Sequence, residues 1–345
     1  MPTQFYQEQR IPLKTIFREK EFWILILLGI LYFYRPLFLR ETFFFRDLYL
    51  NILPQKQLLV DFIHARELPL WNPYWHGGQP YLADIPYFTL YPSNLLYLFL
   101  PVLRAFNLNI VFHFIGCSVS AYLFARVIGL RPVSSLIVGV VYEFCGYTLS
   151  LATHGCRLLA MPYLPLLLVF WHLFLFERRR RWFLTAVIVG VLQVFSGASE
   201  MNVISFLVVL GWTVVYCYPQ RGIPHKIMLW MLLGLFCLGI ASVQVFPTLE
   251  MVLQSPRERG LDYATFSQWS LHPGQLLEFF FPGLLGQVNS LPLDIYYWGG
   301  NLVHDGNPYI PSLYFGGVVL VLAMIGGISR CSNRVFPGQV RHFLL

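Results

Sequence analysis

Residues 157–198 read RLLAMPYLPLLLVFWHLFLFERRRRWFLTAVIVGVLQVFSGA, and they give the clearest indication of the fold class. It holds two apolar runs on either side of four consecutive arginines, Arg178 to Arg181. An α-helix needs about 20 apolar residues to cross a bilayer, and each run is close to that length. Arginine and lysine collect in the cytoplasmic loops of membrane proteins. The stretch therefore predicts a membrane hairpin whose arginine turn faces the cytoplasm.

The composition of the whole chain indicates a polytopic membrane protein. Of its 345 residues, 57% are hydrophobic and only 12% are charged, and the mean hydropathy is +0.58. Soluble domains carry about 25% charged residues. The net charge of +7 invites a nucleic-acid partner, but the basic residues lie in short loops beside apolar runs. Because the positive-inside rule explains that placement, we exclude nucleic-acid binding.

Apolar segments of sufficient length recur along the chain. Eight qualify as membrane spans: 22–39, 106–128, 132–152, 157–176, 182–198, 201–218, 227–248 and 311–329. A further apolar segment, 91–101, is bracketed by prolines and too short to span. With that segment left out, the basic segments fall on the side of the N-terminus. We expect an all-α polytopic membrane protein of about eight transmembrane helices in a single domain, residues 1–345, with both termini cytoplasmic.

This topology places two long loops, 40–105 and 249–310, on the outer side of the membrane. They hold most of the acidic residues, so we expect function to reside there. Within the first loop, 47–67 carries apolar residues at helical spacing and predicts an amphipathic juxtamembrane helix. The stretch that follows, 68–92, is dense in Pro, Gly, Trp and Tyr and predicts turns.

Asp47 is the first candidate for catalysis. It closely follows the first apolar span, so it is expected near the membrane surface on the outer side. A carboxylate there can act as a general base toward a lipid-linked substrate. The alternative is an acid that only anchors the juxtamembrane helix, and the residues by themselves leave both interpretations open.

The most distinctive strings lie in the turn-rich stretch. Residues 66–74 read RELPLWNPY, 76–84 read HGGQPYLAD and 90–97 read LYPSNLLY. One interpretation is a rigid loop that holds aromatic and polar groups near the lipid head groups. The other is an interfacial aromatic plug with no chemistry. The first interpretation makes the following residues candidates for substrate binding: Trp71, Asn72, Tyr74, His76, Gln79 and Asp84.

These strings resemble the YfhO-like bacterial membrane proteins, in which a first-loop acid precedes a G-E-L-P-L-W-N-P-Y motif; this chain has Arg66 in place of the glycine. The resemblance implies a GT-C glycosyltransferase architecture in the bacterial cytoplasmic membrane, with an extracytoplasmic active face. It also implies a polyprenyl-phosphate-linked sugar as donor, a cell-envelope acceptor, and Asp47 as the catalytic residue. Members of the family are usually longer, so this chain is expected to be a short or C-terminally truncated member.

Three arginines near the outer ends of the helices are candidates for binding the donor phosphate. They are Arg157, Arg257 and Arg259. A guanidinium can bind phosphate through two parallel hydrogen bonds. The alternatives are a solvated charge cluster for Arg257 and Arg259, and a snorkelling side chain for Arg157.

Two glutamates are candidates because a carboxylate at membrane depth is costly unless it serves a function. Glu200 lies in the predicted tight turn 196–201, where the alternative is a polar hairpin tip in water. The same argument applies less strongly to Glu143, which is expected one turn from the end of its helix.

Four histidines are expected on the outer side: His76, His154, His272 and His304. They open the alternative of a divalent metal ion near Asp47 or Asp84, although no spacing specifies a site. No other cofactor is expected. The chain has no Gly-rich phosphate loop, which argues against a nucleotide-sugar donor.

The preferred hypothesis is a membrane glycosyltransferase of the hexosyltransferase class, working on lipid-linked substrates at the outer face. One alternative is a transporter or flippase for a lipid or oligosaccharide, which would need charged residues deep in the membrane and interrupted helices. The other is a non-catalytic scaffold for cell-envelope assembly.

Overall fold

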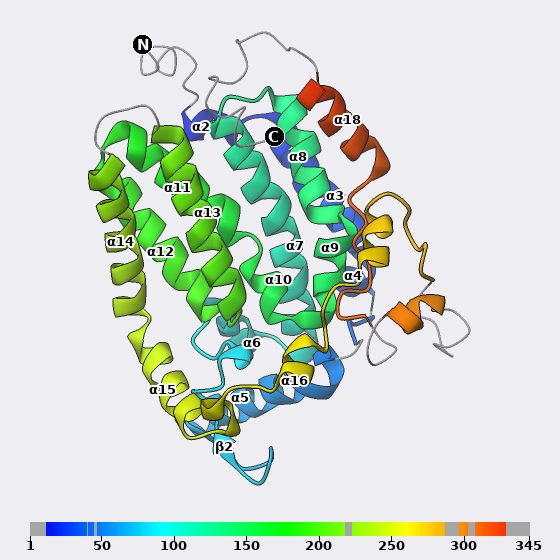
Figure 1. Ribbon diagram of the computed structural model, residues 1–345. Coiled ribbons are helices and arrows are strands. Elements are labelled where there is room, and N and C mark those ends of the chain that lie inside the picture. The colour runs from blue at the N-terminus through cyan, green and yellow to red at the C-terminus, as the bar shows by residue number, and fades with distance from the viewer. Residues whose placement is uncertain are drawn as a thin grey trace.

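The computed structural model describes residues 12–39, 41–44, 47–217, 223–286, 297–302 and 308–328. Within these ranges the chain is largely helical, as expected, and its long helices form a bundle (Figure 1). The basic C-terminal tail and His304 lie outside the described residues.

The short 3-10 turns are Ile85–Tyr87, Pro92–Leu95, Leu151–His154, Pro256–Arg259, Pro273–Phe279 and Trp298–Leu302. The α-helices are α2 Leu13–Ile16, α3 Lys20–Tyr32, α4 Tyr34–Phe38, α5 Leu53–Ala65, α6 Leu96–Phe99, α7 Val102–Val127, α8 Pro132–Phe144, α9 Gly146–Ser150, α10 Cys156–Ala160, α11 Tyr163–Glu177, α12 Arg180–Phe195, α13 Ser199–Cys217, α14 Ile223–Ile240, α15 Ser242–Leu253, α16 Tyr263–Ser267 and α18 Gly317–Ile328.

Four helical segments in the described residues are long and apolar enough to cross a membrane, which indicates a membrane protein. They are Val102–Val127, Pro132–His154, Cys156–Glu177 and Ile223–Ile240. The other segments that the sequence predicts as spans are also helical, but they are shorter or less apolar than this standard, or, like α3 and α4, interrupted. The structure therefore establishes the helical class and four candidate spans.

Helix α7 lies at the centre of the bundle and packs against α3, α8 and α11. Small residues let these helices approach closely, as is usual between helices in membranes. A Cβ atom on Gly139 would lie 2.9 Å from the carbonyl oxygen of Ser118, and one on Gly29 would lie 2.6 Å from Cγ1 of Ile115. Both glycines are therefore required by the packing.

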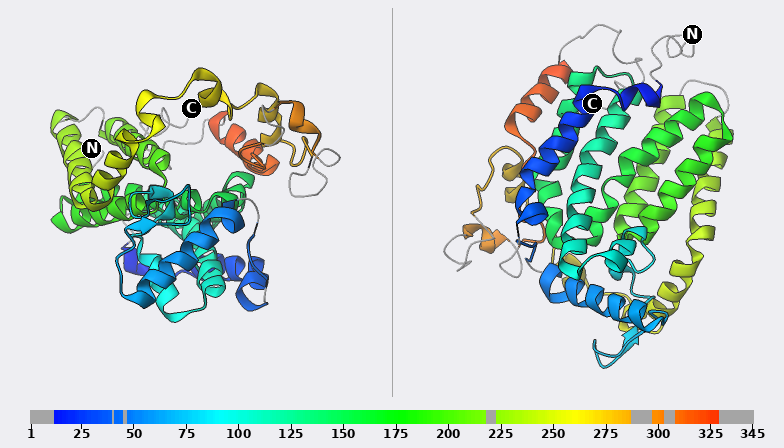
Figure 2. Two further views of the ribbon diagram at one scale, coloured as in Figure 1. Left: turned by 90° about the horizontal axis from the view of Figure 1, so that it is seen from below. Right: turned by 180° about the vertical axis from the view of Figure 1, so that it is seen from behind.

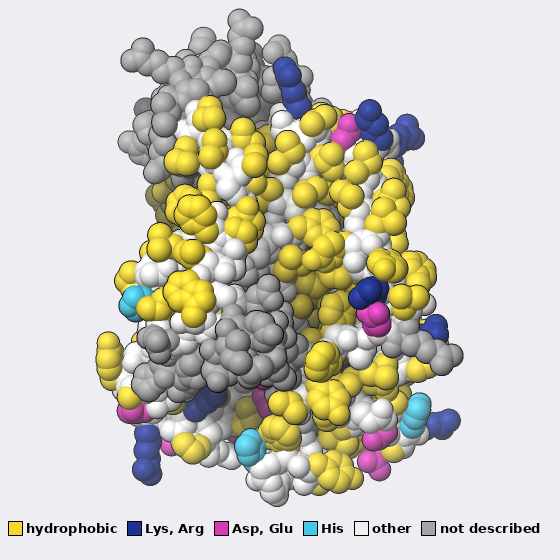
Figure 3. Space-filling model, turned by 90° about the vertical axis from the view of Figure 1, so that its right-hand side faces the viewer, with side chains coloured by type: hydrophobic (Ala, Val, Ile, Leu, Met, Phe, Trp, Pro, Cys, Tyr) yellow, Lys and Arg dark blue, Asp and Glu magenta, His cyan; other side chains and the backbone are white. Residues whose placement is uncertain are grey.

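Charged residues are segregated towards the two ends of the bundle. At one end, here called the basic end, Arg126 pairs with Glu19 at 2.6 Å, and Glu177 lies 3.4 Å from Arg179 and 3.6 Å from Arg181. On the face in Figure 3, charged side chains gather towards both ends and hydrophobic ones dominate the band between, apart from one adjacent acidic and basic pair. On this face, the pattern matches contact with membrane hydrocarbon at the middle of the bundle.

The opposite end, here called the loop end, is crossed by the predicted juxtamembrane helix (Figures 1 and 2). It begins as a π-helix, Leu48–Ile52, and continues as α5. Leu48, Ile52 and Leu59 are buried, which confirms the predicted amphipathic spacing. Pro54 lies where the π-helix gives way to α5, in the first turn, where proline needs no hydrogen-bond partner for its nitrogen.

A buried lysine fixes the turn-rich stretch to α5. Lys56 is fully buried, and its Nζ donates hydrogen bonds to the carbonyl oxygen of Tyr87 at 2.7 Å and to Oδ1 of Asn94 at 2.9 Å. The same nitrogen lies 3.4 Å from the centre of the Phe88 ring. Burial lowers the pKa of Lys56 well below its usual value. The lysine is thus part of the packed core of this loop.

The turn-rich stretch contains one short antiparallel hairpin, β1 Trp71–Asn72 with β2 Gln79–Pro80. The hairpin projects from the bundle at the loop end (Figure 1). It follows the C-terminal end of α5, whereas Asp47 precedes the start of the π-helix. The hairpin nevertheless folds back along α5, because Nδ2 of Asn72 donates a hydrogen bond to Oε1 of Gln55 in the first turn of that helix.

Candidate functional site

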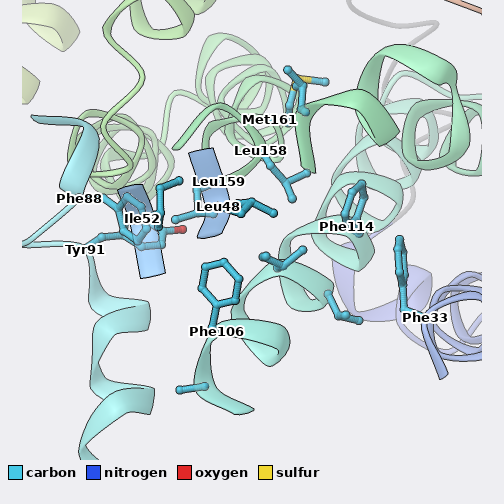
Figure 4. Packing of buried hydrophobic residues seen from close by; sticks show 14 of the residues in the cluster. Phe33, Leu48, Ile52, Phe88, Tyr91, Phe106, Phe114, Leu158, Leu159 and Met161 are labelled. Atoms are coloured by element: carbon cyan, nitrogen blue, oxygen red, sulfur yellow. The ribbon is translucent and has the colours of Figure 1, made fainter. Parts of the chain in front are cut away.

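Core packing brings the first loop against α10, and this positions Asp47. Leu48 and Ile52 belong to the same buried cluster as Leu158 and Leu159 of α10 (Figure 4). Gly155 makes the approach possible, because a Cβ atom there would lie only 2.4 Å from Cδ1 of Ile52. Asp47 directly precedes Leu48, and Arg157 directly precedes Leu158. Two residues far apart in the sequence therefore both adjoin the same packed cluster.

Arg157 is the centre of a group of charged and aromatic side chains. Its guanidinium forms an ion pair with Glu200 at the start of α13. The guanidinium carbon also lies 5.0 Å from the centre of the Tyr309 ring, close enough for a cation–π contact. The Arg157 side chain is 25% exposed and that of Glu200 is 45% exposed, so the pair can be reached by solvent or ligand.

Tyr309 connects this pair to His154 and to Trp269 of the second long loop. Its ring centre lies 4.6 Å from that of His154 and 5.4 Å from that of Trp269. Burial raises the pKa of the Tyr309 hydroxyl, the charges of Glu200 and Asp47 raise it further, and that of Arg157 opposes them. Asp47 is exposed and acts on the same hydroxyl through its charge, which is the weakest of these effects. These residues form the Arg157 cluster: Asp47, His154, Arg157, Glu200, Trp269 and Tyr309.

A second group forms around Asp84 at the hairpin. Asp84 accepts a hydrogen bond from Nε2 of Gln79 at 2.9 Å, and the same nitrogen lies 3.1 Å from the hydroxyl of Tyr87. Burial raises the pKa of Asp84, while hydrogen bonds from Tyr87 and Gln79 and the charges of Arg257 and His76 oppose that shift. These five residues are called the Asp84 cluster.

The Asp84 cluster is attached to α15. The side chain of Gln244 donates to the carbonyl oxygen of Leu82 at 2.7 Å, and the hydroxyl of Thr248 donates to that of Ala83 at 2.8 Å. The two long loops therefore meet at this point, which explains why Arg257 of the second loop acts on Asp84 of the first.

The remaining candidates of the hairpin have structural or exposed positions. Asn72 is buried, where its Nδ2 donates to Oε1 of Gln55 at 2.9 Å and its Oδ1 accepts from the Tyr74 amide at 2.9 Å. Trp71 and Tyr74 are exposed on the projecting hairpin. Arg259 is exposed just after the seventh predicted span. The structure does not bring these residues to Asp47.

Glu143 lies in the last turn of α8, as expected, but the break that follows falls within a longer candidate span. It lies 11 residues from each end of the candidate span Pro132–His154, since 143 − 132 and 154 − 143 both equal 11. Its side chain is fully buried, and no residue in the described ranges hydrogen-bonds either carboxylate oxygen. A Cβ atom on Gly29 would lie 2.9 Å from Oε1. The carboxyl group is therefore enclosed between helices at mid-span.

Sequence reasoning did not single out Tyr309 or Trp269. The one available signal is that Tyr309 ends an Asn-Pro-Tyr string, 307–309, which repeats the Asn-Pro-Tyr of 72–74. His154 was noted only as one of four histidines. Among the described residues, no three His, Cys, Asp or Glu side chains come together as a group of metal ligands.

Comparisons with known proteins give no match. No protein family, no curated protein and no solved structure matches this chain.

Proposed function

We propose that this protein is a membrane glycosyltransferase of the GT-C type, with eight transmembrane helices and the loop end at the outer face of the bacterial cytoplasmic membrane. It would move a sugar from a polyprenyl-phosphate donor to a cell-envelope acceptor. The observation that supports this most is the assembly of the Arg157 cluster. An acid, an accessible arginine and aromatic faces from distant segments lie together at the loop end of a membrane bundle.

In this proposal the side chains divide the chemistry as follows. Asp47 takes the proton from the acceptor hydroxyl, whose oxygen attacks the anomeric carbon of the sugar. The bond from that carbon to the phosphate oxygen breaks, and polyprenyl phosphate leaves with the electron pair. Arg157 stabilises the charge that develops on the phosphate. Arg157 takes this role rather than Arg257, because the charge of Arg257 acts on Asp84.

Trp269 and Tyr309 replace the hairpin aromatics as stacking faces for the sugar. Trp269 is 42% exposed and packs against Tyr309, which in turn contacts Arg157. A sugar ring on Trp269 would thus lie beside the guanidinium that binds its phosphate. Glu200 holds Arg157 in place through the ion pair.

The test is sugar transfer by purified protein in bilayers, with a labelled polyprenyl-phosphate sugar and a cell-envelope extract as acceptor. Replacing Asp47 with Asn should lower the rate by about 10²–10⁴-fold, the usual contribution of a general base. Asp61→Asn is the matched control, because Asp61 is an exposed acid on α5 outside the cluster. An Asp47→Asn variant that folds and transfers sugar like the wild type would refute the role of Asp47.

A transporter or flippase is the second candidate, favoured by two specific observations. Glu143 is a buried acid at mid-span, and the helices α3, α8 and α14 are each interrupted where a shorter helix follows. Such features are typical of membrane transporters. In the same bilayers, movement of intact labelled lipid to the opposite leaflet without release of polyprenyl phosphate would favour transport over transfer.

A further inference from the structure

A hollow of about 500 Å³ lies between α12, α13 and α14. Two glycines in its wall let the surrounding helices pack closely. A Cβ atom on Gly190 would lie 2.5 Å from Sγ of Cys237, and one on Gly234 would lie 2.6 Å from Cζ of Phe206. Phe206 and Trp230 stack with ring centres 4.0 Å apart and form an aromatic wall. Its size is within the range of about 300–1,000 Å³ usual for small-molecule sites.

One end of the hollow is polar. Gln193 lines it and donates a hydrogen bond to the hydroxyl of Ser205 at 2.7 Å. Asn202 also lines it, and its buried Oδ1 accepts no hydrogen bond from any described residue. A buried acceptor without a partner is costly, so this atom favours a ligand that carries a donor. Asn202 lies in the first turn of α13, at the loop end.

The hollow opens towards the surroundings of the bundle. Helix α14 forms one wall, and only 11% of its most apolar window is buried, compared with 67% for α7. Three residues that line the hollow from α14 are exposed: Met231, Leu235 and Leu238. In a membrane, such a helix faces hydrocarbon chains. The occupant must therefore be apolar along most of its length.

The hollow is separate from the Arg157 cluster. Each residue of an α-helix turns the chain by about 100°, so Glu200 and Asn202 point about 200° apart around α13. Glu200 meets Arg157 on one side of the helix, and Asn202 lines the hollow on the other. A ligand bound at Arg157 does not fill it.

We propose that this hollow, the α12–α14 groove, binds one acyl chain of a membrane phospholipid whose head group donates a hydrogen bond to Asn202. An open, lipid-facing groove with a single polar end fits a bilayer lipid, whose hydrocarbon chain and polar head have the same arrangement. The proposal does not depend on the catalytic function, because the groove lies apart from the cluster that carries it.

The test uses phosphatidylethanolamine with a photoreactive diazirine in one acyl chain, mixed into phosphatidylcholine vesicles that contain the purified protein. After illumination, mass spectrometry should find crosslinks concentrated in 190–209 and 230–238, with few on the other lipid-facing surfaces. Crosslinks spread evenly over the exposed apolar surface would overturn the proposal, and this measurement needs no variant.

Two neighbouring residues provide matched variants. Val203 lines the groove and Ile204 does not, although the two are exposed to 59% and 50%. Val203→Trp should fill the groove and lower crosslinking about tenfold, whereas Ile204→Trp should leave it unchanged. Asn202→Leu should reduce labelling by removing the head-group contact, which gives a second measurement if Val203→Trp does not fold. Equal labelling of the two tryptophan variants would contradict the assignment.

Discussion

Arg157 lies over the ring of Tyr309, with its guanidinium carbon 5.0 Å from the ring centre, while it remains paired with Glu200. A guanidinium is planar, so it can stack and form an ion pair at the same time. The stacking contact with Tyr309 therefore restricts the orientation of the Arg157 guanidinium, and the ion pair with Glu200 restricts it further. An arginine held in this way is prepared for an anion that accepts two parallel hydrogen bonds, such as phosphate.

Replacing Arg157 with Lys should weaken binding of polyprenyl phosphate by about tenfold or more, since the ammonium cannot provide two parallel hydrogen bonds. The measurement is binding of labelled polyprenyl phosphate to the protein in lipid nanodiscs. Arg259→Lys is the control, because Arg259 is an exposed arginine outside both clusters. Equal affinity of Arg157→Lys and the wild type would remove Arg157 from the phosphate site.

Replacing Lys56 with Met should destabilise the first loop. The change leaves Oδ1 of Asn94 and the carbonyl of Tyr87 without their donor, at about 1–3 kcal/mol for each unpaired group. The difference in unfolding free energy between the wild type and Lys56→Met should grow as the pH rises. The pKa of Lys56 is lowered in the folded state, so the unfolded chain binds the proton more tightly and wild-type stability increases up to about pH 10.

Thermal unfolding in detergent at several values between about pH 7 and pH 10 measures this effect. Lys20→Met, a change at an exposed lysine, should follow the wild type throughout. If Lys56→Met showed the same increase of stability with pH as the wild type, the pH dependence would not come from Lys56.

Replacing Asp84 with Asn should change the pH dependence in the opposite direction. The pKa of Asp84 is raised by burial in the folded state. Its contribution to stability is therefore present at low pH and is lost as the pH rises from about 3.9, the ordinary Asp value, through the folded pKa. The Asn variant keeps an acceptor for Gln79 and should lose less stability over that range. Thermal unfolding curves of the variant, the wild type and the exposed-site control Asp61→Asn would show it, and parallel pH profiles would contradict it.

Replacing Gly197 with Ala should be strongly destabilising. Gly197 has a φ of +90°, and a Cβ atom there would lie 2.4 Å from the carbonyl oxygen of Ile85. A non-glycine residue in such a conformation costs about 1–3 kcal/mol before any clash. Gly283 has a φ of +65° with no described atom within 4 Å of its Cβ position, so Gly283→Ala measures the conformational cost by itself. Equal losses of unfolding free energy would show that the turn 196–201 is not held against the first loop.

The sequence predicted the helical class and the juxtamembrane helix because these depend on local periodicity. Leu48, Ile52 and Leu59 recur at helical spacing and are buried, although Gln55 and Lys56 are buried in the same helix. Asp47, Arg157 and Glu200 were each identified as candidates, but only separately. The first loop approaches Arg157 because Ile52 packs against Gly155. These two residues are about a hundred positions apart, and a local sequence pattern cannot predict such a contact.

Other relationships could not be predicted for the same reason. Arg257 is predicted to bind the donor phosphate, yet in the structure its charge acts on Asp84, because hydrogen bonds from α15 to residues 82 and 83 bring the second loop there. Tyr309 belongs to a loop without helical or strand periodicity, so its position depends entirely on tertiary contacts. Within the described ranges, the number of helices long enough to span is also smaller than predicted from hydropathy. Breaks such as the one at Phe33 divide segments that are continuously apolar in sequence into shorter helices.

The contrast in burial between α7 and α14 has a consequence for sequence variation. Side chains of α7 must fit several neighbours, so exchanging one apolar residue for another of different shape will usually lower stability. On the outward face of α14, a side chain has only to be soluble in hydrocarbon. A saturation mutagenesis scan should therefore find that Leu, Ile, Val, Phe and Met are interchangeable at Met228 or Phe236 but not at Phe114 or Ile110.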